Sequence, residues 1–92
     1  MSSAAAQLTI EGVVQGVGYR YYCYQKAASL KLYGWAKNNP NGSVQVFVEG
    51  DRGAIEVFIK ELKIGPLAAS VSDIKIEWMN FTGNHDRFEI SF

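Results

Sequence analysis

The sequence predicts one α+β domain in which two helices cover one face of a mostly antiparallel sheet, in the order β-α-β-β-α-β with a short extra strand at the end. Two observations predict this architecture. Several short segments alternate apolar and polar residues, which is typical of half-buried strands. Two segments between them repeat apolar residues at helical spacing. The chain has 92 residues, enough for one such core, so residues 1–92 are expected to form a single domain.

The first strand is predicted at residues 7–11, where Leu8 and Ile10 fall on one face. The small and polar residues 1–5 before it are expected to be disordered. Residues 12–18 contain three glycines, which is more backbone freedom than a strand tolerates. They predict a tightly curved loop.

The first helix is predicted from Tyr19 to about Leu32, a stretch without glycine or proline. Cys23, Ala27 and Leu30 recur at helical spacing and predict its buried stripe. A glycine often follows the last turn of a helix, and position 34 is therefore interpreted as the end of this one.

A hairpin follows the first helix. Residues 35–38 predict a short strand that enters a dense turn signal at residues 39–42. Its return strand places Val44, Val46 and Val48 on one face and polar residues with Phe47 on the other.

The second helix carries the strongest periodic signal in the chain. Asp51 is expected to cap its start, and Gly65-Pro66 is expected to end it. The predicted buried stripe consists of Ile55, Phe58, Ile59 and Leu62.

Two further strands complete the pattern, with alternating apolar residues at Ile74, Ile76 and Trp78 and then at Phe88, Ile90 and Phe92. The whole order is that of a ferredoxin-like sandwich with two right-handed β-α-β crossovers. Because the first two strands are then parallel, the glycine loop after one and Asn38 near the end of the other should lie at the same edge of the sheet.

Composition narrows the function classes that fit. Nine basic residues balance nine acidic ones, so no broad charged surface favours nucleic acid or an anionic membrane. No apolar run is long enough to cross a membrane, and the N-terminal residues lack the features of a secretory signal. One cysteine and one histidine supply neither an internal disulfide nor a usual metal cluster. We expect a cytoplasmic monomer with no metal or other cofactor and no nucleic-acid or membrane partner.

The glycine loop and the helix after it predict a local anion site. Such a loop directs several backbone N–H groups into one concavity, where the helix dipole adds partial positive charge. Arg20, at the start of that helix, offers a planar guanidinium able to bind two phosphate oxygens at once. On these residues alone, a tight turn followed by a solvated arginine is the favoured interpretation, and Asn38 is interpreted as an ordinary turn residue.

Two longer motifs favour the functional interpretation. Residues 12–20, GVVQGVGYR, resemble the first signature of the acylphosphatase family. Residues 34–38, GWAKN, together with Gly42, Val44 and Gly50, resemble the second. The motifs stand in the family's order and spacing, and the resemblance covers essentially the whole chain.

The resemblance implies a hydrolase that cleaves acyl phosphates to a carboxylate and inorganic phosphate, with phosphate as product and inhibitor. It implies Arg20 as the catalytic arginine and Asn38 as the catalytic asparagine that positions the attacking water. Tyr19 stands where phenylalanine is common, and its added hydroxyl is expected at most to tune the loop. The implied phosphate-binding loop consists of Gln15, Gly16, Val17, Gly18, Tyr19 and Arg20.

A site with one arginine and one asparagine suits this substrate class. The leaving group of an acyl phosphate is a weakly basic carboxylate, whereas the alkoxide leaving group of a phosphate ester usually needs a general acid or a metal ion. Asn38 can orient water through its amide without acting as a strong base, and the proton is then expected to pass to the substrate phosphate.

Two other functions stay open from the residues. One is a noncatalytic ferredoxin-like module that binds phosphate or nucleic acid, although Phe47 is the lone aromatic of the return strand and no RNP-like segment occurs. The other is an acylphosphatase-like domain that handles carbamoyl phosphate within a larger maturation enzyme, which the free-standing length of the chain disfavours.

Three other features are expected to be structural. Cys23 lacks the downstream arginine that a cysteine-dependent phosphatase needs, so core packing is expected. His85 lies in a polar turn and is expected to be solvated. The tyrosines at positions 21, 22 and 24 could line the site, although packing with partial exposure is the favoured interpretation.

Overall fold

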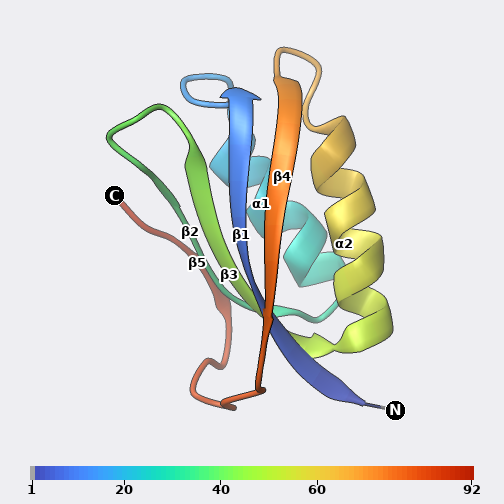
Figure 1. Cartoon of the computed structure of the whole chain (residues 1–92). Coiled ribbons are helices and arrows are strands. Elements are labelled where there is room, and N and C mark those ends of the chain that lie inside the picture. Colours follow the sequence, from blue (N-terminus) through green and yellow to red (C-terminus); the bar gives the residue numbers. More distant parts are fainter. Residues whose placement is uncertain (1) are drawn as a thin grey trace.

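The computed structural model describes residues 2–92 as a five-stranded sheet with both helices on one of its faces (Figure 1). The elements are β1 (Ser3–Val13), α1 (Tyr19–Ser29), β2 (Tyr33–Asn38), β3 (Val44–Asp51), α2 (Arg52–Ile64), β4 (Ser70–Met79) and β5 (Phe88–Ile90). The strand order is β4-β1-β3-β2-β5, and every pair of neighbours is antiparallel except β2 with β5. The predicted ferredoxin-like sandwich is confirmed.

Strand β1 begins earlier than predicted. Ala5 pairs with both β3 and β4, and Ala5 and Ala6 are fully buried on opposite faces of the sheet. The expectation that residues 1–5 are disordered is therefore wrong for residues 3–5, because backbone pairing with β3, joined at Ala5 by pairing with β4, orders them without large side chains. Met1 lies outside the described residues.

Helix α1 ends at Ser29, and Gly34 does not close it. The chain turns at Lys31, which has a φ of 57°, and Gly34 lies inside β2 with a φ of 141°. A Cβ on Gly34 would clash with the carbonyl oxygen of Phe47 on the neighbouring strand. Glycine at this position therefore permits the close approach of β2 to β3, and its place after a helical stretch is what suggested a cap.

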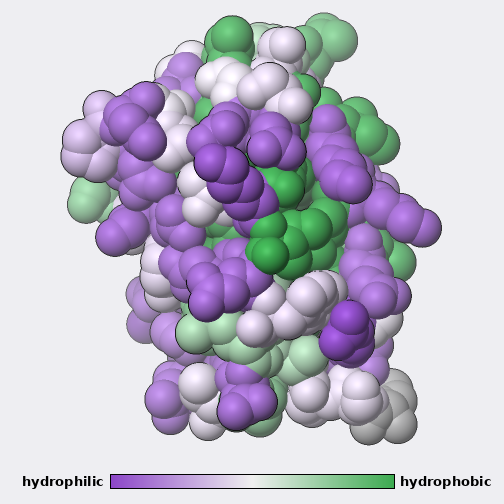
Figure 2. Space-filling model, viewed as in Figure 1, coloured by the Kyte–Doolittle hydropathy of each residue, from purple (hydrophilic) through white to green (hydrophobic). Residues whose placement is uncertain are grey.

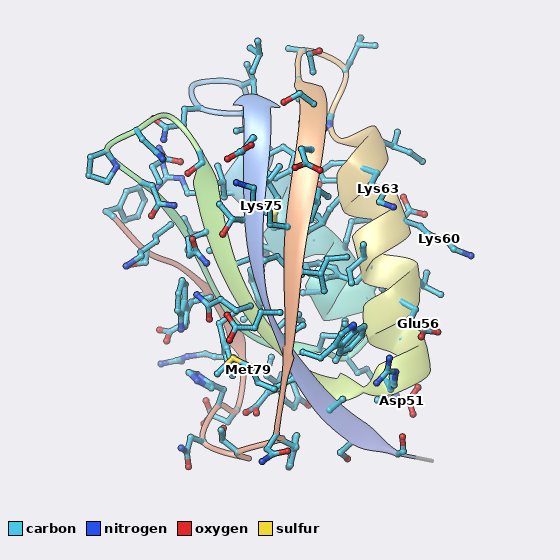
Figure 3. The ribbon with its side chains drawn as sticks, viewed as in Figure 1. Asp51, Glu56, Lys60, Lys63, Lys75 and Met79 are labelled. Atoms are coloured by element: carbon cyan, nitrogen blue, oxygen red, sulfur yellow. The ribbon has the colours of Figure 1, made fainter. Side chains whose placement is uncertain are left out.

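The core lies between the sheet and the helices. Asp51 caps α2 as predicted, since its carboxylate accepts a hydrogen bond of 3.1 Å from the backbone N–H of Ala54. Figure 3 shows Glu56, Lys60 and Lys63 along the exposed surface of α2. The buried side of α2 carries the predicted stripe of Ile55, Phe58, Ile59 and Leu62, which meets Val44, Val46 and Val48 of β3 in one cluster.

The segment between β4 and β5 closes part of the opposite sheet face over Glu49. This carboxylate is fully buried and accepts hydrogen bonds of 2.9 Å from both the backbone N–H and the hydroxyl of Thr82. Burial raises the pKa of Glu49, but the hydrogen bonds and the nearby His85 lower it by more, so its pKa lies below the ordinary value. The charged form of Glu49 thus holds the segment on the sheet.

Phe47 is also covered on this face. Its ring lies between Trp35, with centroids 6.2 Å apart, and His85, with centroids 5.2 Å apart, and it is only 7% exposed. The expectation that His85 is solvated is corrected to partial burial against Phe47. Figure 2 shows hydrophilic residues over much of this face, with a hydrophobic area along the middle of β4 and further hydrophobic residues at the upper and right edges. Phe47 is therefore no exposed stacking platform for bases, which disfavours the nucleic-acid alternative.

The topology brings three chain segments to one edge of the sheet. β1 and β2 are both antiparallel to β3, so they run in the same direction, and the loop after β1 and the turn after β2 emerge together in the upper part of Figure 1. This confirms the predicted convergence. β5 is parallel to β2, so the residues after β5 also run toward this edge.

Candidate active site

The loop between β1 and α1 surrounds open space. Gly16 and Gly18 have φ values of 73° and 76°, in the left-handed region that favours glycine. A Cβ at either position would meet nothing within 4 Å, so backbone conformation and not crowding requires glycine here. Gly18 is the N-cap of α1 and has no side chain to accept from the first turn, whose N–H groups are left for an external acceptor.

Arg20 lies in that first turn and is half-buried. Its Nη1 donates a hydrogen bond of 2.7 Å to the carbonyl oxygen of Ser91, and its Cζ lies 4.7 Å from the ring centre of Phe92. Both partners are neutral, so they orient the guanidinium without cancelling its charge. The N–H of Ser91 donates in turn to the carbonyl of Ala36 at 2.8 Å, which ties this segment to β2.

Tyr19 fixes the start of α1 to the end of α2. Its hydroxyl donates a hydrogen bond of 2.7 Å to the carbonyl oxygen of Leu62, and the side chain is 1% exposed. Burial, with smaller effects from Cys23 and Tyr22, raises the pKa of Tyr19 far above its ordinary value and keeps it neutral. The hydroxyl of Tyr19 already donates to Leu62, so only the backbone N–H of Tyr19 is available to bind an anion.

The side chain of Gln15 joins the loop to the turn that follows Asn38. Its Nε2 donates to the carbonyl oxygens of Asn39 and Ser43, at 2.8 and 2.9 Å. The side chain of Gln15 therefore positions this turn, and only its backbone could face an anion. Asn38 itself is exposed at the end of β2, where solvent can reach its amide.

One cavity of about 240 Å³ joins the main predicted groups, because Gly16, Gly18, Tyr19, Arg20 and Asn38 all line it. Gln15 and Val17, also predicted for the site, are not among the described residues that line this cavity. Val17 packs against the core instead.

Part of the lining was not assigned to the site from the sequence. Val14, Tyr21, Ile90 and Phe92 border the same cavity. Ile90 and Phe92 reach it because β5 pairs with β2 in parallel, which no local pattern signals. Tyr21 was considered for the site, and in the structure it is 57% exposed and stacks on Tyr24 at 6.0 Å between ring centroids.

The other candidates lie elsewhere. Cys23 is fully buried in the core, and burial raises the pKa of its thiol, so it does not supply a thiolate. Within residues 2–92, no three or more His, Cys, Asp or Glu side chains come together as metal ligands. Neither of the two described helices has the length and apolar character needed to span a bilayer.

Known proteins resemble this chain over nearly its whole length. The family model described as Acylphosphatase matches residues 6–90. The acylphosphatase of Pelotomaculum thermopropionicum is 38% identical over 92 residues, which are 100% of both chains. The crystal structure of acylphosphatase from Bacillus subtilis superposes with a TM-score of 0.94 at 34% identity, covering 97% of this chain and 99% of that one. HypF of T. kodakarensis superposes with a TM-score of 0.84 at 29% identity, where 97% of this chain covers only 12% of that chain.

Proposed function

This chain belongs to the acylphosphatase family, and from that premise we propose how its site hydrolyses the carboxyl-phosphate bond of acyl phosphates. The protein is a hydrolase that releases a carboxylate and inorganic phosphate. One observation carries the assignment of roles: a single cavity is lined by Arg20, by the N-terminus of α1 and by Asn38.

The phosphoryl group binds at the loop and at Arg20. The N–H groups of the loop and of the first turn of α1 meet its oxygens, and the guanidinium of Arg20 adds a full positive charge. Phosphoryl transfer passes through a loose transition state with charge spread over the equatorial oxygens. Donors that are already oriented stabilise that charge without reorganising.

Asn38 positions the attacking water. The amide oxygen accepts a hydrogen bond from the water, whose oxygen forms a bond to phosphorus as the bond from phosphorus to the carboxyl oxygen breaks. The electron pair of the broken bond stays on the carboxylate. The water proton passes to a phosphate oxygen, because none of the described residues that line the cavity has a carboxylate or imidazole side chain.

The activity is tested with benzoyl phosphate and the wild-type protein, with and without EDTA. We expect rapid release of benzoate that EDTA does not slow, and inhibition by added inorganic phosphate, because a carboxylate leaves without a metal ion or a general acid. A folded protein that is inactive with and without added metal ions would contradict the proposal.

The Gln15 contact makes a separate prediction about positioning. Gln15→Met keeps the length of the side chain but removes both hydrogen bonds to the turn after Asn38. We expect kcat for benzoyl phosphate to fall by about tenfold, since small misplacements of positioning groups are costly, while the inhibition constant of inorganic phosphate changes little.

The matched control for this variant is Gln25→Met, at an exposed position of α1, which should behave like the wild type. Steady-state kinetics of both variants, with phosphate as inhibitor, check the prediction. An unchanged kcat in Gln15→Met would contradict the positioning role of Gln15.

We further propose that the protein acts as a cytoplasmic monomer on a small-molecule substrate, without a nucleic-acid or membrane partner. The formal charge of zero and the burial of the single cysteine support this proposal. Sedimentation at micromolar concentration tests the monomer, since a dimer would double the measured mass.

A further inference from the structure

The cavity at the proposed site is lined by two chemically different sets of residues. Gly16, Gly18, Arg20 and Asn38 form a polar set, which we name the phosphate side. The remaining lining residues form the apolar side, with hydrocarbon or aromatic surface: Val14, Tyr19, Tyr21, Ile90 and Phe92. A substrate bound through its phosphate therefore shares the cavity with apolar side chains.

The apolar side has a buried part and an open rim. Val14 and Tyr19 are each 1% exposed and offer little surface to a ligand. Tyr21 is 57% exposed, and Phe92 is fully exposed, so both rings have surface that a ligand can cover. Covering apolar surface is favourable in proportion to the area removed from water.

Phe92 is held next to the phosphate side of the cavity. Its backbone neighbour Ser91 accepts from Arg20 at 2.7 Å and donates to Ala36 at 2.8 Å, so the segment is attached to both α1 and β2. The guanidinium of Arg20 also lies 4.7 Å from the centre of the Phe92 ring. The same arginine thus links the phosphate side to the aromatic rim.

From this arrangement we infer that Tyr21, Ile90 and Phe92 form an acyl-group subsite that selects acyl phosphates with an apolar, aromatic or branched, acyl group. The inference rests on the proposed function of the site. Apart from Arg20, no charged side chain occurs among the described lining residues, so an acyl group with a second carboxylate or phosphate finds no partner there. A methyl group as small as that of acetyl phosphate covers little of the rim.

The test compares kcat/KM for benzoyl phosphate, acetyl phosphate and succinyl phosphate in the wild type. We expect benzoyl phosphate to be favoured over each of the others by about tenfold or more, as an apolar pocket discriminates a ring from a methyl group. Equal values for all three substrates would overturn the subsite while leaving the proposed function intact. Failure to hydrolyse any of them would overturn the proposed function itself.

Variants then locate the subsite. Phe92→Ala and Tyr21→Ser should each reduce the ratio of benzoyl to acetyl kcat/KM by about fivefold, because each removes part of the apolar surface. The inhibition constant of inorganic phosphate reports on Arg20 and should change little. The matched control is Tyr33→Ser, an aromatic residue that is 40% exposed at the opposite end of β2 and should leave the ratio unchanged.

Two results would overturn the role of the rim. If Phe92→Ala weakens phosphate inhibition and slows both substrates equally, the ring only positions Arg20. If neither rim variant changes the ratio in a folded protein, as judged by circular dichroism, the acyl group does not contact these side chains.

Discussion

Replacing Arg20 by glutamine is expected to lower kcat/KM for benzoyl phosphate by about 10³-fold or more and to weaken inhibition by inorganic phosphate strongly. Among the described residues that line the cavity, Arg20 alone has a charged side chain. Its contacts to Ser91 and Phe92 are neutral, so its charge is available both to the bound phosphate and to the transition state. Its removal therefore affects binding and turnover together.

Steady-state kinetics with phosphate as inhibitor check this prediction. Arg20→Lys keeps the charge but not the planar fork, and it should recover only part of the activity. Arg87→Gln is the matched control, because Arg87 is exposed and paired only loosely with Glu89, at 3.7 Å. Near-normal turnover in a folded Arg20→Gln variant would contradict the assigned role.

Replacing Asn38 by alanine is expected to lower kcat by about 10²-fold while inorganic phosphate inhibits as before. The side chain is exposed at the end of β2, and the backbone pairing of this position with Val44 does not depend on it. The variant should therefore fold and bind phosphate through the loop and Arg20. In the proposed mechanism, the group that it loses is the one that orients the water.

The distinction between kcat and phosphate inhibition is the measurement that separates the two roles. Asn84→Ala, at an exposed asparagine far along the chain, is the control. Equal losses of phosphate affinity in Asn38→Ala and Arg20→Gln would show that Asn38 binds phosphate and does not chiefly position water.

Local patterns predicted most of the fold. The spacing of Ile55, Phe58, Ile59 and Leu62 predicted the buried stripe of α2, and the alternation from Val44 to Val48 predicted β3. Both patterns act within a few residues, where backbone geometry determines which side chains share a face. The same holds for the cap at Asp51, whose partner is three residues away.

The predictions that were wrong concern residues whose environment depends on contacts far away in the sequence. Ala5 and Ala6 show no alternation, and burial of both depends on covering each side of the sheet, by the helices on one and by the segment around Thr82 on the other. Gly34 follows a helical stretch and fits a cap by local rules. Its actual role depends on its distance from Phe47 across the sheet.

Local patterns and the two motifs were enough to identify the order of the elements, the family, and Arg20 and Asn38 as candidate site residues. Three features became evident only in the folded chain: Gln15 holds the turn after Asn38, Ser91 and Phe92 hold Arg20, and an apolar rim borders the cavity. Periodicity, capping and turn chemistry operate between near neighbours in the chain. The contacts of the site depend on the order of strands in the sheet, which the packing of the whole core selects and no single segment encodes.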